Sequence, residues 1–153
     1  MRIRKVKITT DDKIYIEYER EDKQGQWDLF TITCAGQPRP KFFKAMEALK
    51  KHAGDLLELD LPEDQLKVRG VTYSYSEEKG VMGAVVSFRY KLKKSGTSMA
   101  LNSPHKPEHE YREDKKKPKP ASFLTKGCVE DLVKLKVECQ EYLKGERQQQ
   151  TLL

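Results

Sequence analysis

Hydrophobic and polar residues alternate along the first third of the chain. Ile14, Ile16 and Tyr18 stand at every second position, with polar residues or Tyr15 between them. A period of two is typical of a β-strand that buries one of its faces. A Thr-Thr-Asp-Asp turn and a later aromatic and β-branched run then divide this part of the chain into strands. The predicted strands cover residues 2–9, 13–20 and 27–34.

The period lengthens after Pro38-Arg39-Pro40, where apolar residues begin to recur three and four positions apart. This spacing predicts a helix with one buried face, and proline is tolerated in the first turn of a helix. We expect its apolar stripe to belong to the core: Phe42, Phe43, Met46, Leu49 and Ala53. The same spacing predicts a second helix at about 127–145.

Two longer strands are predicted between these helices, at about 66–76 and 80–93, joined by a short connection that contains Gly80. In the second strand Ala84, Val86 and Phe88 alternate with residues that become basic toward its end. The elements follow the order β-β-β-α-β-β-loop-α. The sequence therefore predicts an α+β fold with an antiparallel sheet of about five strands and two helices.

Length and composition predict one domain. The chain has 153 residues, of which 35% are charged and 37% hydrophobic, enough for one modest core. Residues 94–126 show no periodicity and collect Pro, Ser, Lys and His, which predicts a mobile loop within a single domain at 1–145. Residues 146–153 are mostly polar, and we expect them to form a flexible tail.

No apolar run approaches the ~18 residues that a membrane helix needs, and none follows the basic residues after Met1. Cys34, Cys128 and Cys139 are odd in number, so we expect reduced thiols rather than a disulfide framework, with Cys34 and Cys139 serving as small buried side chains. These features predict a cytoplasmic protein without a membrane segment.

Catalytic motifs are missing from the sequence: we find no Gly-x-Ser-x-Gly, no glycine-rich phosphate loop and no acid pair of distinctive spacing. His105 and His109 are four residues apart, but Pro104 and Pro107 disfavour the helix that would bring them to one metal ion, and the alternative is a solvated loop. We therefore predict a protein that is not an enzyme and needs no cofactor.

Positive charge is concentrated in the predicted hairpin. The formal net charge of the chain is +6, and residues 65–96 contain seven basic and two acidic residues. Cations on a sheet can contact phosphates while aromatic rings stack on bases, which predicts binding of nucleic acid, single-stranded in preference to duplex. The candidate residues are Lys67, Arg69, Tyr73, Tyr75, Arg89, Lys91 and Lys93. The alternative is that Val71, Tyr73 and Tyr75 belong to the core.

The end of the chain, Gln149-Gln150-Thr151-Leu152-Leu153, resembles the short peptide by which many bacterial replication and repair proteins dock on the DNA sliding clamp. That motif consists of a Gln, any residue, a Ser or Thr, a Leu, and a final Leu or Phe. The resemblance implies a partner-binding tail that uses Gln149, Thr151, Leu152 and Leu153.

Three segments also resemble a group of small bacteriophage and prophage proteins without an established activity. They are Thr33-Cys34 with Pro38-Arg39-Pro40, Val68-Arg69-Gly70-Val71, and Leu101 to Pro107. The resemblance implies the cytoplasm of a bacterial host and a role in phage DNA metabolism. Two hypotheses follow: an accessory protein that binds nucleic acid through its basic hairpin face, or an interaction module or inhibitor that binds a host or phage protein.

Overall fold

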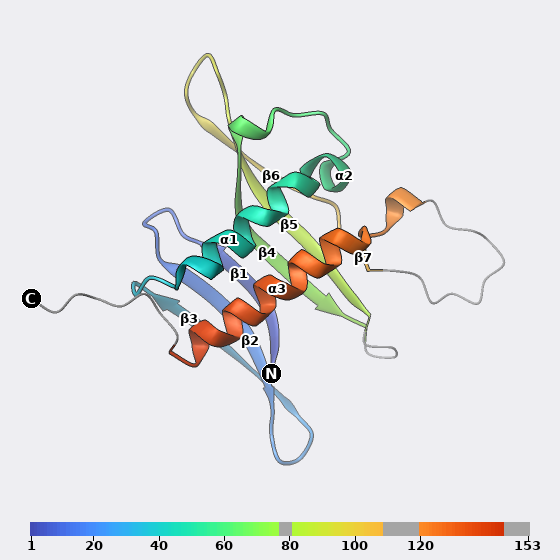
Figure 1. The fold of residues 1–153 in the computed structure, drawn as a ribbon. Coiled ribbons are helices and arrows are strands. Elements are labelled where there is room, and N and C mark those ends of the chain that lie inside the picture. Colours follow the sequence, from blue (N-terminus) through green and yellow to red (C-terminus); the bar gives the residue numbers. More distant parts are fainter. Residues whose placement is uncertain (77–80, 109–119, 146–153) are drawn as a thin grey trace, which may run out of the picture.

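The computed structural model describes residues 1–76, 81–108 and 120–145. Its strands form one antiparallel sheet in the spatial order β3-β2-β1-β4-β5-β6, and β7 pairs with the far end of β5 (Figure 1). The strands are β1 (Arg2–Ile8), β2 (Ile14–Glu21), β3 (Trp27–Cys34), β4 (Leu66–Tyr75), β5 (Met82–Lys91), β6 (Ser98–Asn102) and β7 (Lys106–Pro107). The helices are α1 (Pro40–Ala48), α2 (Ala53–Leu57) and α3 (Lys126–Leu143), with 3-10 turns η1 (Leu49–His52), η2 (Glu63–Gln65) and η3 (Pro120–Ser122).

The predicted α+β class is confirmed, with seven strands in the sheet where about five were expected. The two extra strands, β6 and β7, lie inside the segment 94–126 that was predicted to be a loop, so that prediction was wrong for residues 98–102 and 106–107. These strands show no periodicity because the residues of β6 are mostly exposed, while β7 has only two residues and buries a lysine. Polar side chains fix the chain beside them. Ser103 Oγ accepts a 2.9 Å hydrogen bond from the Val86 amide, and the Lys106 ammonium donates to the Asp55 and Ala121 carbonyl oxygens, each at 2.8 Å.

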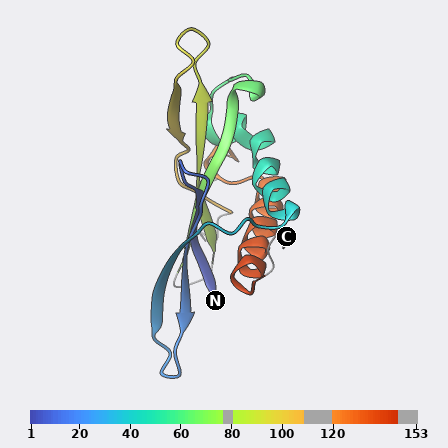
Figure 2. The same ribbon diagram turned by 90° about the vertical axis from the view of Figure 1, so that its left-hand side faces the viewer.

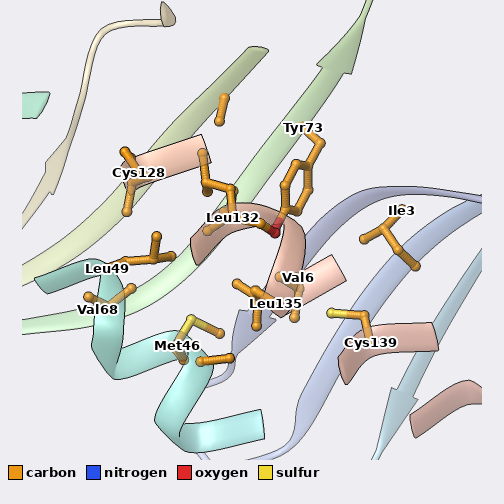
Figure 3. Packing of buried hydrophobic residues seen from close by; sticks show 14 of the residues in the cluster. Ile3, Val6, Met46, Leu49, Val68, Tyr73, Cys128, Leu132, Leu135 and Cys139 are labelled. Atoms are coloured by element: carbon orange, nitrogen blue, oxygen red, sulfur yellow. The ribbon is translucent and has the colours of Figure 1, made fainter. Parts of the chain in front are cut away.

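Both long helices lie on the same face of the sheet. In Figure 2 α1 and α3 stand on one side, and no described helix lies on the other. The strand residues that face the helices are apolar, as the alternation predicts, and meet the apolar stripes of α1 and α3 in one core. Figure 3 shows Met46 and Leu49 beside Val68, and Leu132 and Leu135 of α3 near Tyr73 and Val6. The opposite side of the sheet is called the open face below.

Two polar pairs fix α3 to the rest of the chain. The Arg39 guanidinium donates two hydrogen bonds, of 2.8 and 2.7 Å, to the Glu138 carboxylate. His52 Nε2 lies 2.7 Å from the Asp131 carboxylate, and both side chains are buried. Buried polar groups need such partners, because an unpaired one loses its hydration without compensation. The pairs therefore set the position of α3 over the sheet.

One irregularity in β4 decides which side chains reach the open face. The pairing of β4 with β5 shifts between Val68 and Gly70, so Arg69 is an extra residue, a β-bulge. A bulge reverses the alternation of all residues that follow it. As a result Lys67 lies on the open face, whereas Val71 and Tyr73 face the helices and are buried.

Candidate nucleic-acid interface

Basic side chains of three adjacent strands meet on the open face. Lys7 of β1 pairs with Gly70 of β4, and Gly70 pairs with Ser87 of β5. One step along the sheet, Lys67 pairs with Arg89. Side chains of directly paired residues lie side by side on the same face. Long cations therefore surround a strip of small residues at the middle of the sheet.

This strip is the floor of a hollow, called the basic hollow, with a cavity volume of about 430 Å³. Its polar and small lining residues include Thr72, Ser87, Ala100 and Asn102. The cations that line it are Lys5, Lys7, Arg69 and Arg89. Among the described residues that line it there is no carboxylate. A hollow with four cations and hydroxyl and amide groups is suited to anionic oxygens, above all phosphates.

Arg69 is held in place by the end of β1. Its guanidinium donates a 2.9 Å hydrogen bond to the Thr9 carbonyl oxygen from the bulge position. Among the described residues this is its one hydrogen bond, which leaves other guanidinium N–H groups to a ligand, since arginine carries five donors in a planar fork. The bulge thus presents a positioned cation at the rim of the hollow.

A larger cavity of about 760 Å³, called the side pocket, lies at the edge of β4. β1 pairs with β4 only through Lys5–Lys7, opposite Gly70–Thr72, so the first residues of β4 have no strand beside them on that edge in the described part of the chain. The pocket extends from there to α1, and Arg69 and Arg89 line both cavities. The two cavities are therefore neighbours that share a pair of arginines.

Four of the five basic residues predicted for the interface lie together in the structure. Lys67, Arg69, Arg89 and Lys91 all line the side pocket, and Arg69 and Arg89 also line the basic hollow. Lys93 is exposed beyond the end of β5 and lines neither cavity.

The predicted role of Tyr73 and Tyr75 in stacking is corrected by the structure. Tyr73 is 1% exposed, and its hydroxyl donates a 2.8 Å hydrogen bond to the Leu132 carbonyl oxygen of α3. Tyr75 is half-buried and donates a 2.6 Å bond to the Ile3 carbonyl oxygen. The bulge at Arg69 is the reason, because it turns both rings away from the face that carries Lys67. The alternative reading, in which both tyrosines belong to the core side, describes them correctly.

Of the remaining candidates only His105 lies within the described residues, and it lines neither cavity. His105 Nε2 lies 2.6 Å from Ser74 Oγ, and His109 is outside the described residues. Within the described part of the chain no three His, Cys, Asp or Glu side chains form a group that could hold a metal ion. Gln149, Thr151, Leu152 and Leu153 also lie outside the described residues.

Cys128 lies three residues before Asp131, the partner of His52, in the first turn of α3. Burial, and next the nearby Asp131 carboxylate, raise the pKa of the Cys128 thiol to about 12. A nucleophilic cysteine needs a lowered pKa, since the thiolate is the reactive form. Cys128 is therefore a protonated core residue at neutral pH, and it does not form an activated pair with His52.

Three residues that line the two cavities were not predicted from the sequence: Lys5, Lys7 and Phe43, whose ring is exposed. The first two carry a visible signal, since they alternate with Val6 and Ile8 in the first strand and must face away from the core. Phe43 was assigned to the core stripe but is 37% exposed and lines the side pocket. It lies beside the edge of β4 that has no paired strand in the described part of the chain.

No family model matches the chain, and searches of the curated proteins and of the solved structures found no match either. None of the described helices is long and apolar enough to cross a membrane.

Proposed function

We propose that this protein binds nucleic acid through its open face and acts as a non-enzymatic accessory protein of phage or bacterial DNA metabolism in the host cytoplasm. The observation that supports the proposal most directly is the basic hollow, in which Lys5, Lys7, Arg69 and Arg89 surround a carboxylate-free floor. Small floor residues let a sugar-phosphate backbone approach closely, and the cations contact it without reading its sequence.

The test is a titration of fluorescein-labelled oligonucleotide at about 50 and about 200 mM salt, where each phosphate contact steepens the salt dependence. The double variant Lys7→Gln/Arg89→Gln should bind more weakly than wild type and with a smaller salt slope. The matched control, Lys41→Gln/Lys44→Gln, removes the same charge from the exposed side of α1. It should bind nearly as wild type.

Two outcomes contradict the proposal. If the wild type does not bind the oligonucleotide at about 50 mM salt, the proposed function is wrong. Equal weakening by both double variants would show attraction by overall charge and no role for the hollow.

The second candidate, a protein-interaction module, is favoured by the outer strand of the sheet. β3 is an edge strand that exposes Trp27 (41%), Leu29 (60%) and Phe30 (41%). An exposed, apolar edge strand offers unpaired backbone groups to another chain.

A pull-down from nuclease-treated bacterial lysate separates the two candidate functions. A protein partner that is captured by wild type and lost with Leu29→Lys supports the protein-interaction module. Capture of a sliding clamp that persists in Leu29→Lys would instead point to Gln149–Leu153.

A further inference from the structure

The side pocket differs chemically from the basic hollow beside it. On its α1 side the pocket is lined by the apolar Phe43 and Met46 and by the Glu47 carboxylate, and Asp64 supplies a second carboxylate. Phe43, Met46 and Glu47 lie three and four residues apart and so share one side of the helix. Carboxylates repel phosphates but accept hydrogen bonds from the amino and ring N–H groups of bases. The pocket is also lined by five cations, so it differs from the hollow by its added carboxylates and aromatic ring and not by a lack of positive charge: Lys50, Lys67, Arg69, Arg89 and Lys91. Acceptors beside an aromatic ring suit a flat, nitrogen-rich ring.

A further acceptor lies in the wall of the pocket. The Gln65 side chain donates a 2.8 Å hydrogen bond to the Lys91 carbonyl oxygen, and its Oε1 atom is buried with no hydrogen-bond partner among the described residues. Buried acceptors are rarely left unpaired in proteins. A ligand donor can reach this buried atom only if the Gln65 amide turns toward the pocket, which exchanges the bond to Lys91 for one to the ligand.

Arg69 and Arg89 join the two cavities, since both line each of them. A backbone that follows the cations of the hollow therefore passes the mouth of the side pocket. The cavity volume of about 760 Å³ exceeds what one nucleobase needs. In a duplex the bases are stacked and paired, so only an unpaired base could enter.

We infer that the side pocket receives one unstacked base of a single-stranded nucleic acid whose phosphates lie in the basic hollow. The base rests against Phe43, and its donor groups face Glu47, Asp64 and Gln65. This inference rests on the proposed function and adds to it the class of nucleic acid. It also gives single-strand preference a physical basis that the buried tyrosines do not provide.

The test compares a short fluorescein-labelled oligodeoxyadenylate with an abasic strand of the same length, which keeps every phosphate and has no bases. Stacking of one base predicts that wild type binds the adenylate about five- to 150-fold more tightly. Phe43→Ala and Phe43→Leu should abolish this difference without weakening binding of the abasic strand. Phe43→Tyr, which keeps the ring, should preserve it. Lys7→Gln/Arg89→Gln should weaken both strands alike.

Each other result overturns the inference. If wild type binds both strands equally, the base pocket is wrong while the proposed function stands. If it binds neither, the proposed function fails and the base pocket with it. If Phe43→Ala, with a thermal transition like that of Phe43→Tyr, keeps the full preference for adenylate, the base lies elsewhere on the open face.

Discussion

Gly70 of β4 lies against Lys7 of β1 so closely that no side chain fits between them. A Cβ atom on Gly70 would be 2.8 Å from the Lys7 Cβ and 2.5 Å from the Val6 carbonyl oxygen. This contact allows β1 to pair with β4 directly after the bulge, and it keeps the floor of the basic hollow flat. A glycine in a strand often marks such a close backbone approach.

Gly70→Ala should lower the free energy of unfolding by about 1 to 3 kcal/mol, the usual cost of overpacking. Gly54 is the matched control, because its Cβ would meet only the Leu59 carbonyl oxygen at 3.9 Å and it lies in α2. Gly54→Ala should leave stability unchanged or raise it by up to about 1 kcal/mol. Urea unfolding of both variants gives the comparison, and equal effects would contradict the importance of the contact.

Substitutions of Tyr73 and Arg89 should affect different properties, stability in the first case and nucleic-acid binding in the second. Tyr73→Phe loses the buried hydrogen bond to Leu132 and should lower the unfolding free energy by about 1 kcal/mol, with oligonucleotide affinity unchanged. Arg89→Gln should do the reverse, since Arg89 lies on the open face and lines both cavities. Parallel urea titrations and anisotropy measurements check this pair. Weaker nucleic-acid binding by folded Tyr73→Phe would restore a direct role for the ring.

The contrast between Tyr73 and Arg89 shows how much of the sheet could be predicted from the sequence. The alternation of Ala84, Val86 and Phe88 identified the buried face of β5 correctly, because the extra residue of the bulge lies in β4 and leaves the period of β5 unbroken. In β4 an unbroken alternation would put Lys67 and Tyr73, an even number of residues apart, on one side. The sequence does carry a trace of the bulge, since apolar residues stand at 66 and 68 and then at 71, 73 and 75. This change of phase does not say which residue between Val68 and Val71 is the extra one.

The cavities were beyond prediction for a different reason. The basic hollow joins Lys7, Arg89 and Asn102, which lie on three strands and come together only through the strand order. Local patterns place each residue on a face of its own strand but do not say which strands are neighbours. The hairpin at 66–93 was predictable because its two strands are adjacent in sequence.

Glu138 should be more important to stability than a neighbouring glutamate on the same helix. Its side chain is 9% exposed and accepts two hydrogen bonds from Arg39, which is 32% exposed. Glu138→Gln should lower the unfolding free energy by about 1 to 2 kcal/mol, a value reduced for the partial exposure of Arg39. Glu141→Gln breaks an exposed pair with Lys144 and should change it by less than about 0.5 kcal/mol. Similar unfolding curves for the two variants would refute this difference.

The three cysteines should differ in reactivity. Burial raises the pKa of Cys128 to about 12 and also raises the pKa of Cys139, whereas Cys34 is only half-buried. Because the thiolate is the reactive form, a disulfide reagent at about pH 8 should label Cys34 first and the other two at a rate limited by unfolding. The Cys34→Ser variant should lose the fast phase, and all three thiols of wild type should react quickly in denaturant. A fast phase that survives in Cys34→Ser would contradict the assignment.

Asp131 should make the protein sensitive to acid. Burial alone would raise the pKa of its carboxyl group, but the hydrogen bonds and charges of His52 at 2.7 Å and Lys51 at 3.2 Å outweigh burial and lower that pKa. A carboxyl group with a lowered pKa stabilises the fold above its unfolded pKa of about 3.9, and this contribution is lost as the pH falls through the lower folded value.

Lys51→Met removes one of the two partners and should therefore move the pKa of Asp131 upward, toward its value in the unfolded chain. Less stability should then be lost as the pH falls below about 4. NMR titration of the Asp131 carboxyl carbon, in native and in urea-unfolded protein, measures the pKa shift in each state. Lys144→Met removes an equally exposed lysine that is paired with Glu141 instead, so it should leave the titration of Asp131 unchanged. An Asp131 titration that is the same in Lys51→Met as in wild type would show that His52 alone holds the carboxylate in its charged form.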